Sequence, residues 1–240
     1  MDKRHFLKLA GASFALAPVA SMAAINQTNA TDINGLSGLS DITANAKPIT
    51  VEERKARIEK AQSLMKAQDI AAILVEPGAA MDYFSGIKWW RSERLTALVI
   101  PQKGDMAVVT PFFEKPSVLE SLAIGDDVRV WQEHESPFDV VANILKSRGI
   151  TSGNIGFESS VRYFVVTGVS QALPNMSIVP AEPITLGCRM YKTPSELALM
   201  HKANEVTLRA YEFVFNNLKL GMSQQDVKSL MNTAQQRLGG

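Results

Sequence analysis

The chain has 240 residues, of which 46% are hydrophobic and 20% charged, a composition typical of one or two globular domains and not of a disordered chain. Its 25 Lys and Arg residues nearly balance its 24 Asp and Glu residues, so no nucleic acid partner is expected. A single cysteine, Cys188, excludes an internal disulfide and a Cys-rich zinc site, and we interpret it as a packed small side chain and not as a nucleophile.

The first segment, residues 1–25, predicts an export signal. Basic residues precede an uncharged run at residues 9–25 that ends among small residues, as secretory signals do. The run is shorter than the about 20 apolar residues of a membrane span, so we expect cleavage near residues 21–23 and no stable membrane span afterwards. Residues 3–8 resemble a twin-arginine signal with lysine in place of the first arginine. We expect a periplasmic or extracellular location, reached by a twin-arginine-like route, with an uncleaved anchor as the alternative.

The middle of the chain predicts a linker followed by an α/β domain. Residues 26–48 show neither the helical nor the strand period of apolar residues and are rich in Asn, Thr, Ser and Gly. This composition indicates a solvated linker. A capping box from Thr50 to Glu53 then predicts a helix that ends near residue 68. Beyond it, strand and helix patterns alternate, which indicates an α/β fold. The predicted strands are residues 71–75, 95–100, 106–109, 128–131, 154–157 and 178–179, and the predicted helices are residues 113–122, 137–146 and 161–173.

We expect a compact domain over about residues 49–187, which is long enough for an independent core. Its predicted core includes Ile73, Leu74, Val75, Leu98, Val99, Val108, Val130 and Ile155.

Two amphipathic helices are predicted after this domain. Thr193 and Glu196 form a second capping box around Pro194, which suits the first helical position. Gly221 ends the first helix, and Ser223 begins another. We expect these helices to be held less stably than the strands and to leave apolar side chains exposed for self-association. The side chains expected to be exposed are Leu197, Met200, Val214, Leu230 and Leu238.

Common catalytic motifs give little support for chemistry within this chain. It contains neither a Gly-x-Gly-x-x-Gly motif nor a phosphate-binding loop, and its serine segments lack the second glycine of a nucleophile elbow. One candidate metal-binding cluster consists of Glu133, His134, Glu135 and Asp139. We interpret it instead as a solvated loop, because charged residues clustered after a strand usually lie in one. We interpret His201 as a residue on a helix face.

Three short motifs, in order, resemble a known enzyme family. They are Asp82-Tyr83-Phe84-Ser85-Gly86, Ser92-Glu93-Arg94, and Arg189-x-x-Lys192-Thr193-x-x-Glu196. Together they resemble the creatinase, prolidase and aminopeptidase P family over about residues 50–240. Leu95 departs from that pattern, because many members have proline after Glu-Arg.

The resemblance implies an α/β fold in two parts. Residues 49–187 would form a creatinase-type N-terminal domain, a mixed sheet with flanking helices. Residues 188–240 would be the two helices that begin a pita-bread catalytic domain, which this chain leaves incomplete. In complete members that domain holds two divalent metal ions, Mn or Zn, with two Asp, one His and two Glu. That set is absent after Tyr191, so we expect neither metal ligands nor catalytic residues in this chain.

The resemblance also implies a function. We expect the N-terminal part of an exported Xaa-Pro metallopeptidase, similar to aminopeptidase P or prolidase, which hydrolyses proline-containing peptides before proline when complete. This chain alone is expected to be inactive. Two alternatives stay open. The chain is a non-catalytic dimerisation or binding module in one, and part of a creatinase-like amidinohydrolase of small molecules in the other.

The sequence GIKWWRSER, residues 86–94, is the candidate substrate-binding site. It places Trp89 and Trp90 beside Arg91 and Arg94 in a predicted loop, and Trp and Arg are common binding anchors. The resemblance implies that this loop forms a wall of the active site, often that of the neighbouring subunit. We therefore expect these four residues to bind the substrate's backbone or carboxylate across a homodimer. The alternative is a surface loop with one tryptophan in the core.

Overall fold

The computed structural model describes residues 35–240, so the predicted export signal and part of the predicted linker lie outside the described residues. The chain divides into two compact units. The larger unit comprises residues 46–201, and the smaller comprises residues 202–240 together with the segment that ends at residue 45. Among residues 35–240, no helix combines the length and the apolar content needed to cross a bilayer.

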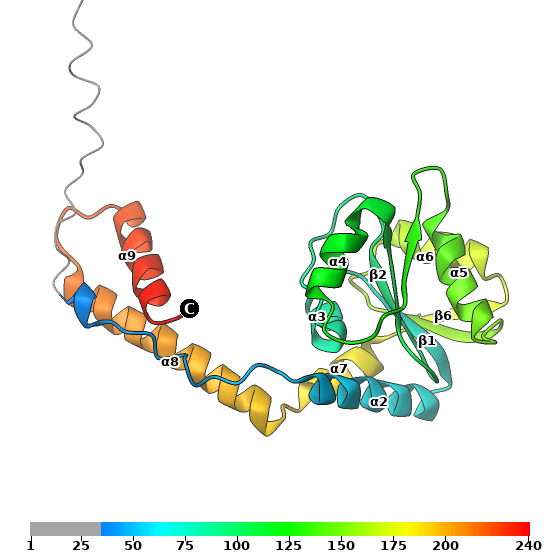
Figure 1. Cartoon of the computed structure of the whole chain (residues 1–240), viewed down its shortest axis with the longest axis horizontal. Helices are drawn as coiled ribbons and strands as arrows, with labels where there is room; N and C mark the ends of the chain where they lie inside the picture. The colour runs from blue at the N-terminus through cyan, green and yellow to red at the C-terminus, as the bar shows by residue number, and fades with distance from the viewer. Residues whose placement is uncertain (1–34) are drawn as a thin grey trace, which may run out of the picture. The chain divides into compact units, whose positions relative to one another are not determined.

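The larger unit is built on one mixed six-stranded sheet (Figure 1). Its strands are β1 (Ile70–Val75), β2 (Ala97–Pro101), β3 (Ala107–Pro111), β4 (Val128–Trp131), β5 (Gly153–Phe157) and β6 (Met176–Pro180). Their spatial order is β4-β3-β2-β1-β5-β6. The β1–β2 and β2–β3 pairs are antiparallel, whereas β3–β4, β1–β5 and β5–β6 are parallel. All six strands overlap the predicted ones, and the α/β fold with a mixed sheet is confirmed.

Alternating side chains of the central strands feed two separate cores. In β1, Ile73 and Val75 belong to one hydrophobic cluster, and Ala72 and Leu74 belong to the other. This alternation follows from the two-residue period of a strand that is covered on both faces. Of the eight predicted core residues, seven are buried, while Val130 on the edge strand β4 is half-buried.

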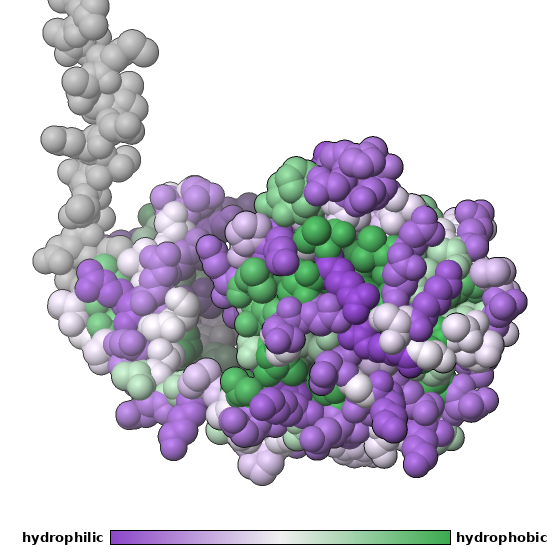
Figure 2. Space-filling model, turned by 45° about the vertical axis from the view of Figure 1, so that its right-hand side comes forward, coloured by the Kyte–Doolittle hydropathy of each residue, from purple (hydrophilic) through white to green (hydrophobic). Residues whose placement is uncertain are grey.

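Helices cover both faces of this sheet (Figure 1). The first cluster is closed by α2 (Val51–Ala67), α3 (Ala79–Ser85), α4 (Lys115–Ser121) and α7 (Glu182–Met190). The second is closed by α5 (Pro137–Ser147) and α6 (Tyr163–Ala172). Figure 2 shows apolar patches set among hydrophilic residues on one face of the larger unit.

Two of these helices, α3 and α7, were not predicted from the sequence. They begin after Gly78 and Ala181, whose side chains offer no capping group, and both helices are short. By contrast, the capping box at Thr50 begins α2 as predicted, with the Glu53 N–H donating to Thr50 Oγ1 at 3.1 Å. Missing caps do not by themselves explain the two omissions, because α4 and α6 also lack side-chain caps and were predicted from their apolar pattern.

The smaller unit has a hydrophobic cluster of its own. It contains α9 (Gln224–Arg237) and the part of α8 (Pro194–Asn217) that begins at Lys202. A short 3-10 helix, η1 (Leu36–Gly38), precedes a segment that packs on the same cluster. The buried members are Val206, Ala210, Phe213, Val214, Leu230, Ala234 and Leu238, with Leu36, Leu39, Ile42, Val227 and Met231 partly buried against them.

This cluster corrects two expectations. Val214, Leu230 and Leu238, which we expected to be exposed, are buried because α8 and α9 pack on each other and on residues 36–42. For the same reason, residues 36–42 are not a solvated linker, since their Leu and Ile side chains repeat at three-residue steps and find an apolar surface. Leu197 and Met200, in the larger unit, are exposed as expected.

Hydrogen exchange is expected to distinguish the two units. The smaller unit buries seven residues in its cluster, against 20 and 19 in the two clusters of the sheet. Because local opening is governed by buried apolar contacts, amides of residues 202–238 should exchange at least about tenfold faster than those of β1 and β2. Exchange measured by mass spectrometry at neutral pH tests this. Equal protection in both units would contradict it.

Candidate functional site

The candidate site is the loop of residues 86–96, which joins α3 to β2. It begins at Gly86, whose φ of +85° lies in the left-handed region. A Cβ at this position would lie 2.6 Å from Cβ of Ala123, and the Ala123 N–H donates to the Ser85 carbonyl at 2.8 Å. Only glycine satisfies both the backbone conformation and this close approach. The Tyr-x-x-Gly motif therefore marks the sharp turn that launches the loop.

The two tryptophans of the loop have different environments. Trp89 is half-buried and packs against the first core cluster. Trp90 is 91% exposed. Because an exposed indole gains contact area only when something covers it, Trp90 is available as a binding anchor. Trp89 instead fits the alternative of a core tryptophan that fixes the loop.

The two arginines of the loop also have different partners. Arg94 donates through Nε to Glu133 at 2.7 Å, pairs with Glu93 through Nη1, and has its guanidinium 5.4 Å from the ring centre of Phe113. The hydrogen bond to Glu133 raises the pKa of Arg94. Arg91 donates to the Pro77 carbonyl and to Ser160 Oγ, both at 3.1 Å. The four predicted residues therefore share a loop, but their side chains do not converge on one point.

The loop is tied down by a buried ion pair that sequence reasoning missed. Glu76 follows β1, and its side chain is fully buried. It accepts three hydrogen bonds from Arg162, from the backbone N–H at 2.8 Å, from Nε at 2.9 Å and from Nη2 at 2.6 Å. The same guanidinium donates to the carbonyls of Ser92 and Arg94. Arg162 therefore links the end of β1 to the backbone of the candidate loop.

One signal for this pair was present in the sequence. Glu76 directly follows the buried run of residues 71–75, and a buried carboxylate requires a charged or hydrogen-bonding partner. The sequence does not identify Arg162 as that partner, because the two residues lie 86 positions apart.

Residues of the other two family motifs are joined by Arg57. Its guanidinium donates to Glu196 at 2.8 Å and to the Tyr83 carbonyl at 2.7 Å, and it lies 4.0 Å from the centre of the Tyr83 ring. Glu196 also accepts from the Thr193 N–H at 2.8 Å, so the second predicted capping box is confirmed. The Tyr83 hydroxyl donates to the Cys188 carbonyl at 3.1 Å. These motif residues therefore hold the start of α8 against α2 and α3.

Cys188 is a packed residue, as interpreted from the sequence. Its side chain is fully buried. Burial raises the pKa of the thiol by more than the nearby Lys60 lowers it. The thiol therefore stays protonated and is a poor nucleophile.

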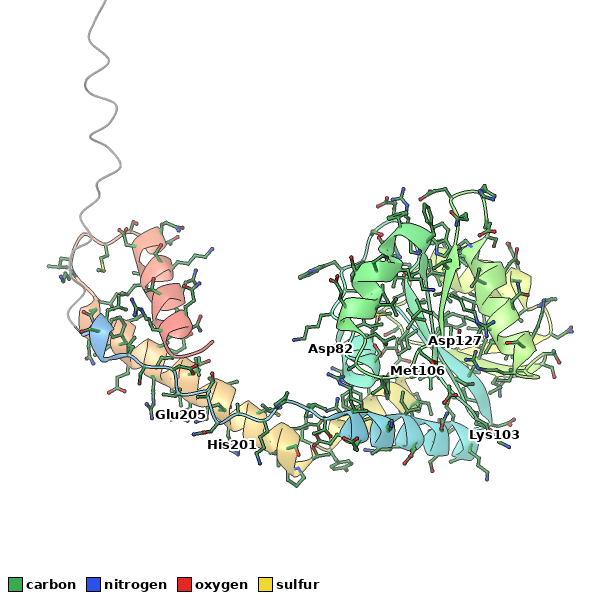
Figure 3. All side chains as sticks on the ribbon, in the orientation of Figure 1. Asp82, Lys103, Met106, Asp127, His201 and Glu205 are labelled. Carbon is green, nitrogen blue, oxygen red and sulfur yellow. The ribbon has the colours of Figure 1, made fainter. Side chains whose placement is uncertain are left out.

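The acidic residues and histidines of the described chain do not fit a metal centre. Within residues 35–240, no three His, Cys, Asp or Glu side chains gather closely enough to hold an ion. Glu133 is paired with Arg94, and the Gln132 N–H donates to Glu135 at 2.7 Å. On α8, His201 is exposed, and the neighbouring Glu205 pairs with Lys202 and Arg209 at 2.6 and 2.7 Å (Figure 3). Within residues 35–240, the described side chains therefore do not supply the donors for the two-metal site that the resemblance implies.

Comparisons with known proteins give similarity over most of the chain. A mycobacterial protein named "Probable dipeptidase PepE", from Mycobacterium tuberculosis, is 27% identical over 160 residues, which are 66% of this chain and 42% of that protein. The crystal structure of dipeptidase PepE from Mycobacterium ulcerans matches with a TM-score of 0.67 and 27% identity, over 76% of this chain and 48% of that one. A prolidase from Thermococcus sibiricus shares the fold, with a TM-score of 0.66 at 20% identity, over 75% and 49%.

This chain spans about half the length, or less, of the curated relatives it matches. The sequence profile of the Creatinase/Prolidase N-terminal domain matches residues 57–191, more than half of the chain. The match to the mycobacterial crystal structure is more extensive than this segment. The chain therefore belongs to the creatinase/prolidase family and carries its N-terminal domain.

Proposed function

We propose that this chain is the N-terminal part of an exported Xaa-Pro metallopeptidase, similar to aminopeptidase P or prolidase, that hydrolyses peptides before proline when complete. The observation that carries the proposal is the 27% identity with dipeptidase PepE over 76% of this chain. Further support comes from the family motifs, which the fold uses to connect α2, α3 and α8. Export to the periplasm or beyond is proposed from residues 1–25.

In this proposal the metal ions are bound by residues that this chain does not contain. Two divalent ions, Mn or Zn, would supply hydroxide at neutral pH and polarise the scissile carbonyl. The described residues would shape the substrate entrance, with Trp90 as an apolar contact and Arg94 as a cation for the peptide backbone or carboxylate. Trp89 would hold the loop in place. Arg91 would add a second cation, because its guanidinium contacts only the neutral Pro77 carbonyl and Ser160 and is in none of the ion pairs formed within residues 35–240. A homodimer would bring the loop to the neighbouring active site.

The proposed function can be tested by comparing the 240-residue chain with the complete enzyme. We expect the chain alone to show neither tight stoichiometric binding of Mn²⁺ or Zn²⁺ nor hydrolysis of a proline-containing dipeptide, because the described donors do not gather. The complete enzyme should do both. Calorimetric titration beside the dipeptide assay decides the matter. If the chain alone binds metal and hydrolyses the dipeptide, the metal ligands cannot lie outside it. If the complete enzyme does not cleave proline-containing peptides, the proposed reaction is wrong.

The substrate role of the loop predicts a kinetic effect in the complete enzyme. Arg94→Ala and Trp90→Ala should each raise KM by about tenfold, because each removes a contact of a binding anchor. Tyr163→Ala is the matched control, since Tyr163 is also an aromatic side chain, 81% exposed, but lies outside the loop. Steady-state kinetics with a dipeptide substrate measures the change. An unchanged KM in both loop variants would show that Trp90 and Arg94 do not contribute to substrate binding.

A non-catalytic dimerisation or binding module is the alternative function. Under that alternative the complete protein would dimerise without binding metal or cleaving peptides, so the assays above separate the two functions.

A further inference from the structure

A cleft of about 360 Å³ lies in the larger unit, and Trp90 is not among its lining residues. Its walls come from the segments that follow β1, β5 and β6, three neighbouring parallel strands, and from the candidate loop. In open α/β sheets the crevice outside the carboxyl ends of such strands is the usual place for a ligand. The lining residues used below are Arg91, Glu158, Ser160, Glu182, Thr185 and Arg189.

Two arginines of this cleft carry uncompensated charge. The ion pairs found within residues 35–240 include neither Arg91 nor Arg189. Arg91 uses Nε and Nη2 on the Pro77 carbonyl and on Ser160, which orients its guanidinium beside the cleft. Because guanidinium groups bind carboxylates through paired N–H donors, these two side chains are suited to an anionic group.

A hydroxyl group in the cleft wall supplies a second, independent sign of a ligand. Thr185 is fully buried, yet its Oγ1 has no hydrogen-bond partner among the residues that the structure describes. An unpartnered buried hydroxyl costs free energy, and such groups in native proteins call for a partner. In the free chain this oxygen is closed to solvent, so a ligand in the cleft becomes its partner when the Thr185 side chain turns toward the cleft.

The acidic residues of the cleft narrow the ligand class. The Glu182 carboxylate already has a hydrogen-bond partner within the chain, because its Oε1 accepts from the Ser159 N–H at 2.5 Å. Glu158 takes part in none of the ion pairs formed within residues 35–240. A free carboxylate beside two free guanidiniums disfavours a simple anion and favours a ligand that carries both charges.

We propose that this cleft binds a small α-amino acid, with the ligand carboxylate on Arg91 and Arg189, the Thr185 hydroxyl as an added donor, and the ligand ammonium on Glu158. This site requires no metal and no turnover, so it stands independently of the proposed peptidase activity.

Binding of L-alanine to the 240-residue chain tests the proposal by calorimetry. L-alanine amide, which lacks the carboxylate, should bind at least about tenfold more weakly, and so should L-alanine with the Arg91→Gln and Arg189→Gln variants. N-acetyl-L-alanine, which lacks the ammonium, should also bind more weakly, and Glu158→Gln should remove this difference between the two ligands. Glu133→Gln, outside the cleft, is the control and should bind L-alanine as the unaltered chain does.

Thr185→Val separates binding from folding. Removal of the unpartnered hydroxyl should raise the Tm of the free chain, because valine has the same shape without the desolvation cost, and it should still weaken L-alanine binding. A free amino acid and the carboxyl end of a peptide are distinguished by the N-acetyl arm, since equal binding of N-acetyl-L-alanine would overturn the ammonium subsite. Absence of saturable L-alanine binding, or binding that survives loss of both arginines, would overturn the whole proposal.

Discussion

Glu76→Gln is expected to lower the free energy of unfolding by about 3 kcal/mol, the scale for breaking a buried ion pair. The Glu76 side chain is fully buried and accepts from three donors of Arg162, whose own side chain is 27% exposed. The neutral amide offers one oxygen and turns an N–H group toward a guanidinium. Arg162 should then lose its fixed orientation, and with it the donors for the Ser92 and Arg94 carbonyls. Urea unfolding followed by circular dichroism measures the loss.

Glu133→Gln is the matched control for this prediction. It removes an ion pair with Arg94, but the Glu133 side chain is 55% exposed, so its cost should stay below about 1 kcal/mol. A double variant, Glu76→Met with Arg162→Met, tests the tether itself. Replacing a buried pair by apolar residues is often neutral, but here two loop carbonyls would lose their donors. Faster hydrogen exchange of residues 88–96 is therefore expected even if stability recovers, and an unchanged loop would refute the tether.

Gly86→Ala is expected to destabilise the larger unit by about 3 kcal/mol, since it combines left-handed strain with overpacking. The φ of +85° is unfavourable for any residue with a Cβ. In addition the new methyl group would lie 2.6 Å from Cβ and 3.2 Å from the backbone N of Ala123, so the α4 connection must move. Thermal unfolding of the variant checks this value.

Gly104→Ala isolates the packing part of this effect. Gly104 has a similar φ of +92°, but its added Cβ meets no atom within 4 Å. It should therefore show only the conformational cost, about 1–2 kcal/mol. The excess loss in Gly86→Ala then measures the close approach to Ala123. Equal losses of unfolding free energy in the two variants would show that the backbone near Ala123 moves to admit the methyl group at no cost in stability.

Prediction from the sequence worked best where the signal is local. Apolar runs bounded by turn residues located the strands, and capping groups at Thr50 and Thr193 located the starts of α2 and α8. The pattern did not reveal α3 and α7, two short helices whose buried side chains pack on the first core cluster. The sequence also did not reveal the packing of residues 36–42. Their surroundings are polar in composition, and Leu36, Leu39 and Ile42 pack on a cluster formed by residues far along the chain.

The candidate site was only partly accessible to the same reasoning. The loop and its four side chains were found from the sequence alone, since Trp and Arg are common binding anchors. Their separate environments depend on neighbours such as Glu133, Ser160 and Arg162, which are distant in sequence. One sequence carries no record of which distant residues meet. Buried polar pairing and cleft formation therefore required the three-dimensional arrangement.

The central place of β1 has a consequence for synthesis on the ribosome. β2 can pair with β1 soon after it emerges, but β5, which pairs with the other edge, ends at Phe157. At about 5–20 residues per second, the chain between Val75 and Phe157 takes about 4–16 seconds to be made. Throughout that interval one edge of an almost wholly apolar strand has unpaired backbone groups. Until β5 emerges, this edge of β1 is therefore open to pairing with another nascent chain.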